Sequence, residues 1–250
     1  MQLIELVAYL DQYLRIAEIK DYGPQGLQIE GRSQVRKIVG AVDSHQPVVD
    51  RALQQEADFL LVHHGIFWGK EQMLNGHYGR LIKSFMQNDL SLYAAHLVLD
   101  AHPEVGNNAQ LAKILGLSIV GWFAKAQGTS VGVIAEAETA IPFSTLVQSY
   151  QSLVGPVNLA QQVASPTCKR IGIVSGLGAN YIEEAKALGC DTFLTGETSH
   201  VHYYSASNCG INAIYGGHYA SETVCIKALG QHLVDRFGVD FEFIDLPTGL

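Results

Sequence analysis

The run Phe59-Leu60-Leu61-Val62 is short and wholly apolar, and it constrains the fold more than any other stretch of the chain. A strand with apolar residues on both faces is typical of a parallel sheet that is covered on both sides. Helix-like segments at 46–55 and 78–87 flank this run, and strand-like segments at 38–42 and 91–95 lie beyond them. This alternation of strands and helices predicts an α/β fold.

The second half of the chain follows the same plan. Its apolar periodicity predicts strands at 170–175, 192–195, 211–215 and 240–244, with helices at 180–188, 200–207 and 222–237. Glycine and proline residues punctuate the chain between these segments, as they do between the elements of a folded domain. We therefore expect two lobes of the same α/β class, each built on a mixed sheet.

The two halves also align with each other. A shift of 133 residues places Ile38 on Ile171, Ala52 on Ala185, Asp58 on Asp191, Leu61 on Leu194 and His64 on Glu197. A shift of 122 residues places Tyr93 on Tyr215, His96 on His218 and Asp100 on Glu222. The identities are few, so coincidence is the alternative, but they favour an internal pseudo-repeat with a shorter connection in the second half.

Residues 121–167 differ in texture from both halves. They contain one strand candidate at 131–135, a helix candidate after Pro142 and a polar region at Gln161-Gln162, and they suggest no chemistry. We therefore predict a first lobe at 1–120, a connecting subdomain or edge extension at 121–167, and a second lobe at 168–250.

Composition limits the class of protein. Of the 250 residues, 48% are hydrophobic and 16% are charged, which favours a sizeable buried core over disorder. The net charge of −8 argues against a broad nucleic-acid-binding face, because phosphate affinity requires clustered Lys and Arg. The sequence shows neither a signal-peptide pattern at its start nor an apolar run of membrane-spanning length, so we expect a cytoplasmic protein without membrane contact.

Histidines and acids collect where the predicted strands end. His63 and His64 follow one strand and His96 another, with Asp100 four residues later; Glu197 follows a third strand and His218 a fourth, with Glu222 four residues later. Loops at the carboxyl ends of parallel strands converge on one edge of a sheet. Imidazole and carboxylate ligands together suit Zn, Mn, Fe, Co or Ni. This pattern predicts a divalent-metal site.

Each of these residues also has a simpler interpretation. A single histidine such as His63 or His96 is often a hydrogen-bonded core residue, and Glu222 could be an acid favoured by the first turn of a helix. These interpretations fail jointly, because they do not explain why strand ends collect the ligands. His200 and His202 are two residues apart on a predicted helix and so face different ways. The loop 175–180 is interpreted as a tight turn, with an anion-binding loop as its alternative.

Several motifs occur in an order that resembles the NIF-three-like family, whose bacterial members are often labelled GTP cyclohydrolase 1 type 2 homologs. They are Asp21-Tyr22-Gly23-Pro24-Gln25-Gly26-Leu27-Gln28, Val62-His63-His64-Gly65, His96-Leu97-Val98-Leu99-Asp100, Gly106-Asn107-Asn108, Thr195-Gly196-Glu197 and Gly217-His218-Tyr219-Ala220-Ser221-Glu222. The match spans almost the whole chain and is nearest to the short bacterial form. One departure is Gln25, where relatives commonly carry Asn.

The resemblance implies two related α/β lobes with a dinuclear metal centre between them, in a toroidal homohexamer built as a trimer of dimers. It also implies the metal ligands, namely His63, His64, Asp100, His218 and Glu222, with Glu222 bridging two divalent ions. His96 and Glu197 would lie close by and handle protons, which makes them the expected catalytic residues.

Two functions then compete. The first is a metal-dependent hydrolase that acts on a nucleotide or a related small heterocycle, in which two metals activate water and Glu197 or His96 serves as general acid or base. The second is a non-catalytic metal carrier, buffer or metal-responsive binding protein. The two are distinguished by turnover, and by whether Glu197→Gln removes activity while metal is retained.

Overall fold

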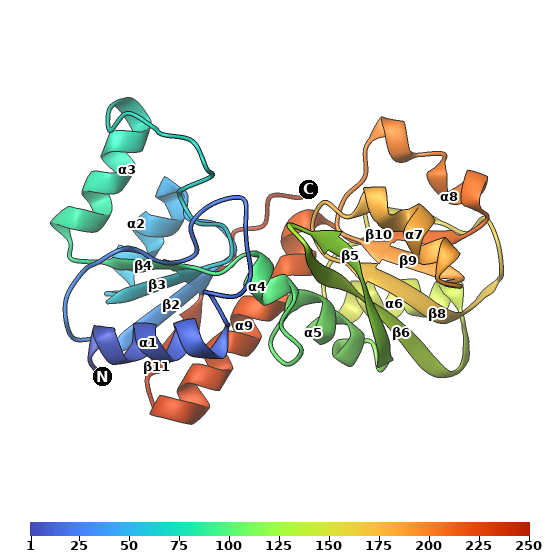
Figure 1. Cartoon of the computed structure of the whole chain (residues 1–250), viewed down its shortest axis with the longest axis horizontal. Coiled ribbons are helices and arrows are strands. Elements are labelled where there is room, and N and C mark those ends of the chain that lie inside the picture. The colour runs from blue at the N-terminus through green and yellow to red at the C-terminus, as the bar shows by residue number, and fades with distance from the viewer. The chain divides into compact units, whose positions relative to one another are not determined.

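The computed structural model of the protein describes residues 1–250, and the chain divides into two compact units. Unit 1 comprises Met1–Leu99 and Ile226–Leu246, and unit 2 comprises Asp100–Cys225 and Pro247–Leu250. Each unit contains one mixed sheet with helices on both of its faces (Figure 1). The α/β class with two mixed sheets is therefore confirmed.

Unit 1 is built on a five-stranded sheet. Its strand order is β1 (Gly26–Ile29), β4 (Ser91–Ala94), β3 (Phe59–Val62), β2 (Lys37–Ala41) and β11 (Asp240–Phe243). Strands β4, β3, β2 and β11 run parallel to one another, and β1 pairs antiparallel with β4. The strand at 26–29 follows Gly23 and Pro24 and begins with Gly26, residues that are more typical of a loop. It pairs along the free edge of β4 in spite of its loop-like composition.

Alternate residues of the parallel strands face opposite sides of this sheet. Val39, Leu60 and Leu92 share one hydrophobic core with residues of α2 (Gln46–Gln54) and α3 (Gly76–Gln87). On the other side, a Cβ at Gly40 would lie 2.6 Å from Ile226 of α9 (His218–Phe237), so glycine permits the close approach of that helix. Helix α1 (Leu3–Tyr13) lies on this second side, where Asp11 accepts a hydrogen bond from the hydroxyl of Tyr93 at 2.8 Å.

Unit 2 is built on a six-stranded sheet. Its strand order is β5 (Ser118–Ala126), β6 (Thr129–Pro142), β8 (Thr167–Val174), β9 (Thr192–Thr195), β10 (Asn212–Tyr215) and β7 (Leu159–Gln161). Strands β8, β9 and β10 are parallel, while β6 and β7 pair antiparallel with β8 and β10. Helices α5 (Asn107–Ile114) and α6 (Phe143–Leu153) pack on one face of this sheet. Helices α7 (Ile182–Ala187) and α8 (Ser205–Cys209) complete the unit (Figure 1).

The division into units differs from the predicted lobe ranges. Residues 121–167 supply most of β5 and the whole of β6, α6 and β7, so they are part of the unit 2 sheet. Both units also contain two separate stretches of chain. The helix predicted at 200–207 is instead a 3-10 turn at His200–His202 followed by the short α8.

Strand pairing shows how the two units correspond. Ile38 of β2 pairs with Phe59 of β3, and Ile171 of β8 pairs with Thr192 of β9, which agrees with the shift of 133 residues. In the third parallel strand the register gives a shift of 121, because Ser91 and Asn212 occupy equivalent places. Tyr93 therefore corresponds to Ile214, and its predicted alignment with Tyr215 was wrong by one residue.

Unit 2 has one more residue than unit 1 immediately after its third parallel strand, β10. Gly217 has a φ of +86°, a backbone conformation that suits glycine, and it precedes His218. One additional residue at this point restores the shift of 122 that relates His96 to His218. His96 and His218 thus follow β4 and β10 at equivalent places, although the registers of these two strands differ by one residue from the shift that relates the histidines.

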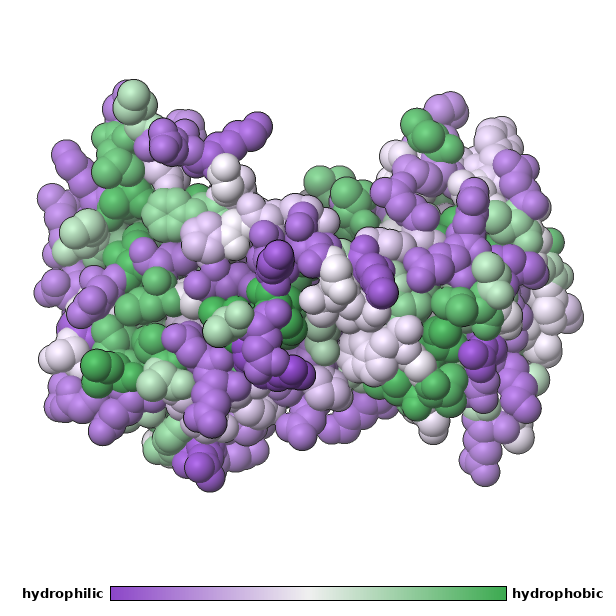
Figure 2. All heavy atoms as spheres, viewed as in Figure 1, coloured by the Kyte–Doolittle hydropathy of each residue, from purple (hydrophilic) through white to green (hydrophobic).

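On the face drawn in Figure 2, hydrophilic residues alternate with small groups of hydrophobic ones over both units. No helix of the structure has the length and apolar content needed to cross a membrane.

Candidate metal-binding residues

The chain turns sharply where β3 ends. The backbone N–H groups of His63 and His64 both donate to the carbonyl oxygen of Val42, at 3.1 and 2.8 Å. The pleat of β3 therefore stops at Val62, which removes the rule that successive side chains of a strand face opposite sides. Gly65 follows, and a Cβ there would lie 2.7 Å from the Cβ of Ala94. The two histidines can consequently face the same region.

Each of three histidines in unit 1 is held through Nδ1. Nδ1 of His63 lies 3.0 Å from the carbonyl oxygen of Ala95. Nδ1 of His64 lies 2.9 Å from Oδ1 of Asp43, and Nδ1 of His96 lies 2.9 Å from Oδ1 of Asp21. An acceptor at Nδ1 selects the tautomer that carries its proton there, so the lone pair is placed on Nε2. Histidines that bind metals are typically oriented in this way.

The three imidazole rings lie close together. His63, His64 and His96 each offer a ring nitrogen within 4.8 Å of those of the other two. His63 is completely buried, while the side chains of His64 and His96 are 18% and 19% exposed. The structure therefore brings together three of the seven predicted site residues, and it places His96 with the predicted ligands His63 and His64 rather than outside them.

Asp21 anchors both His96 and the start of the helical turn α4 (Leu97–Asp100). Its Oδ2 accepts a hydrogen bond from the backbone N–H of Leu97 at 2.9 Å, in addition to the contact of Oδ1 with His96. Burial would raise the pKa of Asp21, but these hydrogen bonds and the charge of His96 outweigh it and hold the pKa below its usual range. The carboxylate thus stays ionised and fixes the imidazole.

Unit 2 contains the four remaining predicted residues, and three of them interact directly. Nδ1 of His218 lies 3.0 Å from Oε1 of Glu197, and its Nε2 lies 3.1 Å from Oε1 of Glu222. His218 and Glu222 are one turn apart at the start of α9. Burial would lower the pKa of His218, but Glu222 and then Glu197 stabilise its cation and raise the pKa to about 9. Without a metal this imidazole is therefore protonated at neutral pH.

Asp100 lies in a buried polar group of unit 2. Its Oδ1 accepts hydrogen bonds from Nδ2 of Asn107 at 2.9 Å and from Oγ of Ser175 at 3.1 Å. The backbone N–H of Ser175 donates to Oδ1 of Asn108 at 2.7 Å, and Nδ2 of Asn108 donates to the carbonyl oxygen of Val131. Asn107 and Ser175 thus hold Oδ1 of Asp100, and Ser175 is itself held by Asn108.

Gly176 is a site residue that the sequence interpretation missed. It has a φ of +58°, and a Cβ at this position would lie 2.2 Å from Oε1 of Glu222 and 3.1 Å from Nε2 of His218. The bend at residues 175–178 is indeed a tight turn, as predicted. Its additional role is to leave room for the two side chains. Gly176 lies two residues after the end of β8, at the position equivalent to Asp43 of unit 1.

Other histidines of the chain, which were not predicted as site residues, make local contacts. Nδ1 of His202 interacts with Oγ of Ser199 on an exposed turn, and His232 stacks on Tyr13 with ring centroids 4.2 Å apart. Nδ1 of His102 accepts the backbone N–H groups of Glu104 and Val105 in a turn. These are structural contacts.

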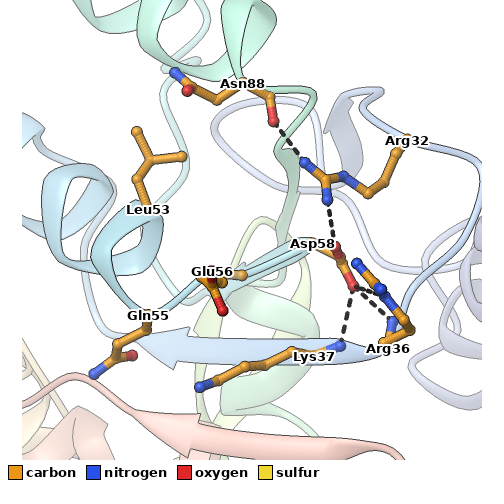
Figure 3. Close-up of a pocket in the computed structure, with 9 residues that line it drawn as sticks. Arg32, Arg36, Lys37, Leu53, Gln55, Glu56, Asp58 and Asn88 are labelled. Atoms are coloured by element: carbon orange, nitrogen blue, oxygen red, sulfur yellow. Dashed lines mark hydrogen bonds and ion pairs between the residues drawn. The ribbon is translucent and has the colours of Figure 1, made fainter.

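A separate cavity of ≈ 620 Å³ lies at the amino-terminal end of β2 and β3, the edge opposite the histidines (Figure 3). Four of the five charged residues that line it, all but Glu56, form ion pairs. Arg32 and Arg36 contact the carboxylate of Asp58, which is only 1% exposed, and Lys37 contacts Glu242. Burial would raise the pKa of Asp58, but hydrogen bonds from the backbone N–H groups of Arg36 and Lys37 hold it below the usual range. We interpret this network as structural.

Comparison with known proteins is consistent with these observations. The chain is 40% identical to a Deinococcus radiodurans protein over 98% of this chain and 94% of that one, and 39% identical to a Pyrococcus abyssi protein over the full length of both. Both relatives are named GTP cyclohydrolase 1 type 2 homolog.

Solved structures agree over the whole length. A protein named ybgI, described as of unknown function, superposes with a TM-score of 0.93 at 35% identity and covers 100% of both chains. TTHA1606 from Thermus thermophilus superposes with a TM-score of 0.88 at 39% identity, again with 100% of both chains covered. The model of the family described as Duf34/NIF3 (NGG1p interacting factor 3) matches residues 1–248, so this chain belongs to the Duf34/NIF3 family.

Proposed function

We propose that this protein binds two divalent transition-metal ions through His63, His64, Asp100, His218 and Glu222, and that it is a metal-dependent hydrolase. The observation that carries the proposal is the arrangement of His63, His64 and His96. Their ring nitrogens converge within 4.8 Å, and each Nδ1 interacts with an oxygen. Core histidines that served packing alone would not need to converge with a common tautomer.

The donor set fits such ions. Imidazole nitrogens and carboxylate oxygens suit Zn, Mn, Fe, Co or Ni, and the close approach of Glu222 and His218 to Gly176 is an arrangement that a side chain at that glycine would prevent. Bound divalent ions would act as Lewis acids toward a water molecule and a substrate oxygen.

Proton transfer is assigned to two residues of this chain. Glu197 contacts His218 through one carboxylate oxygen and is 33% exposed, so it is accessible to a proton donor or acceptor in solution. His96 is held by the ionised Asp21, which would stabilise its cation after proton uptake. The substrate class, a nucleotide or related small heterocycle, is supported by the names of the curated relatives.

The first test is elemental analysis of the purified protein beside His64→Ala and Glu222→Ala, with His77→Ala as the matched control outside the proposed ligands. We expect close to two metal ions per chain in the wild type and in the control, and fewer in both ligand variants. A wild type that carries no metal after reconstitution would contradict the proposal.

The second test separates hydrolysis from metal carriage. GTP and other nucleoside triphosphates are incubated with metal-loaded protein, and Glu197→Gln is compared with the wild type. We expect Glu197→Gln to keep its metal and to lose turnover. Metal binding without turnover of any substrate would support the non-catalytic metal carrier instead. Gel filtration with light scattering would test the proposed homohexamer in the same samples.

A further inference from the structure

Two exposed aromatic side chains lie beside the histidines of unit 1. The ring of Trp68 is 5.3 Å from that of His96 and 5.8 Å from that of His64, measured between centroids. Tyr22 lies on the same histidine, with its ring 6.3 Å from His96. Trp68 is 43% exposed and Tyr22 is 53% exposed. Large aromatic surfaces are thus presented to solvent at the edge of the proposed metal-binding residues.

The two loops that carry these rings are held together through glycines. A Cβ at Gly23 would lie 2.2 Å from the carbonyl oxygen of Phe67. Gly69 has a φ of +69°, and a Cβ there would lie 2.6 Å from the carbonyl oxygen of Tyr22. The backbones on either side of Tyr22 and Trp68 therefore touch, and any side chain at either glycine would separate them. This contact fixes the spacing of the two aromatic residues.

No space for a ligand remains beneath the loops. The cavity that they enclose with His63 and His96 has a volume of only ≈ 10 Å³, about enough for one water molecule. A planar ligand beside these loops would therefore lie against the outer surfaces of Trp68 and Tyr22 rather than beneath them. Flat aromatic rings stack favourably on such surfaces, and the interaction tolerates different ring substituents because every base has a π face.

We propose that Trp68 and Tyr22 form a stacking surface for a planar aromatic ring of the substrate. This proposal rests on the proposed function, because the stacked ring would belong to the substrate of the hydrolase. Stacking would place the groups attached to the ring near His64 and His96. The proposal assigns the ring-binding residues to unit 1 and defines the substrate as a heterocycle with an attached phosphate or sugar. A substrate without a ring would leave both exposed aromatic side chains without a ligand contact.

Fluorescence offers a direct test because the chain has only two tryptophans, Trp68 and Trp122. Trp122→Phe leaves Trp68 as the sole indole reporter, and Trp122 lies on β5 of unit 2. Guanosine monophosphate and ribose 5-phosphate are titrated into this protein after its metal has been removed by a chelator. We expect guanosine monophosphate to quench the emission and to bind at least about tenfold more tightly than ribose 5-phosphate, which lacks the ring.

Substitutions then assign the binding to the two residues, with calorimetry as the readout in the wild-type background. We expect Trp68→Leu to weaken guanosine monophosphate at least about tenfold, Tyr22→Leu to weaken it less, and Trp68→Phe to stay within about threefold of the wild type. Ribose 5-phosphate affinity should not change in any variant. Circular dichroism confirms that each variant is folded.

Equal affinity for the two ligands, or unchanged guanosine monophosphate affinity in folded Trp68→Leu, would overturn the proposal. Because these titrations use metal-free protein, their outcome is independent of the metal analysis. Ring binding in a protein that holds no metal would uphold the stacking surface and reject the hydrolase. Two metals without ring binding would reject the stacking surface and leave the proposed metal binding intact.

Discussion

Asp58 and Asp191 hold equivalent positions in the two units and make the same backbone hydrogen bonds. Oδ2 of Asp58 accepts from the N–H groups of Arg36 and Lys37 at 2.8 and 3.2 Å. Oδ2 of Asp191 accepts from those of Lys169 and Arg170 at 2.8 and 3.0 Å, so the same carboxylate fixes the start of the first parallel strand in each unit. This shared detail supports the internal repeat more strongly than the few identities in the sequence.

The two aspartates differ in their side-chain partners, since arginines contact Asp58 whereas the Thr192 hydroxyl donates to Asp191, and this difference leads to a prediction about stability. Asp58 also accepts a hydrogen bond from the Arg32 guanidinium at 2.9 Å. We expect Asp58→Asn to lower the free energy of unfolding by about 2–3 kcal/mol, because charge-assisted hydrogen bonds are lost at a buried site. Asp191→Asn should cost less. Urea denaturation followed by circular dichroism measures both, and an equal loss would contradict the role given to Arg32.

The pH dependence of this contribution follows from the lowered pKa of Asp58. A group whose pKa is lower in the folded state stabilises the fold above its unfolded pKa of about 3.9, and this contribution is lost as the pH falls through the folded value. The stability difference between the wild type and Asp58→Asn should therefore be constant from neutral pH to about pH 5 and shrink below about pH 4. A stability difference between the wild type and Asp58→Asn that grows as the pH falls would contradict this prediction.

Removal of the partner of a histidine should weaken metal binding. Asp43 orients His64 through a contact of 2.9 Å to Nδ1, and loss of such a carboxylate typically costs about ten- to a hundredfold in metal affinity. We expect Asp43→Asn to lower the metal affinity by this factor, and a chelator competition assay measures the change. Asp50→Asn is the control, because Asp50 bonds only Gln46 on the exposed side of α2 in the hydrogen bonds described for it. Equal metal affinities in Asp43→Asn and Asp50→Asn would show that Asp43 does not support metal binding.

Gly176→Ala tests the space at Glu222. The added Cβ would lie 2.2 Å from Oε1 of Glu222, so the carboxylate must move and metal content should fall. Gly210→Ala is a matched control, because Gly210 has a similar φ of +61° and its Cβ would meet nothing within 4 Å. Both variants should lose about 1 kcal/mol of stability through backbone strain. Only Gly176→Ala should lose metal.

A conservative change at Asp100 tests its buried polar group. Asn at this position keeps the shape and one oxygen that Asn107 and Ser175 can reach, but it removes the negative charge. We expect Asp100→Asn to fold with a melting temperature within about 5 °C of the wild type and to bind fewer metal ions. A variant that retains the full metal content would show that Asp100 serves structure alone.

The sequence predicted the elements whose pattern is local. The apolar run at 59–62 is a strand as predicted, and the helix predicted at 222–237 is present but begins four residues earlier, at His218. Strand burial and helical periodicity are visible in short windows of sequence. The convergence of His63 and His64 could be inferred from Gly65 and the strand end. His96 was expected at the same sheet edge because it follows a predicted strand, but its contact with Asp21 could not be inferred, because it depends on the pairing of β1 with β4.

Other features depend on contacts distant in sequence. Residues 121–167 showed a different texture because β6 is a long strand that pairs with β8 over part of its length and is interrupted by a register shift. The role of Gly176 depends on Glu222, 46 positions further along the chain, so no local pattern indicates it. Contacts between segments that are distant in the sequence determine such positions, and local sequence patterns do not predict those contacts.

Helix α9 belongs to both units, since His218–Cys225 lies in unit 2 and Ile226–Phe237 in unit 1. During synthesis the ribosome therefore releases the first hundred residues without the helix and the strand β11 that complete their sheet. We expect the nascent unit 1 to stay incomplete, and exposed to chaperones, until residues 226–246 have been synthesised. A truncation within α9 would then remove β11 and part of the helix that packs on the unit 1 sheet, so it should unfold unit 1 although residues 1–99 are intact.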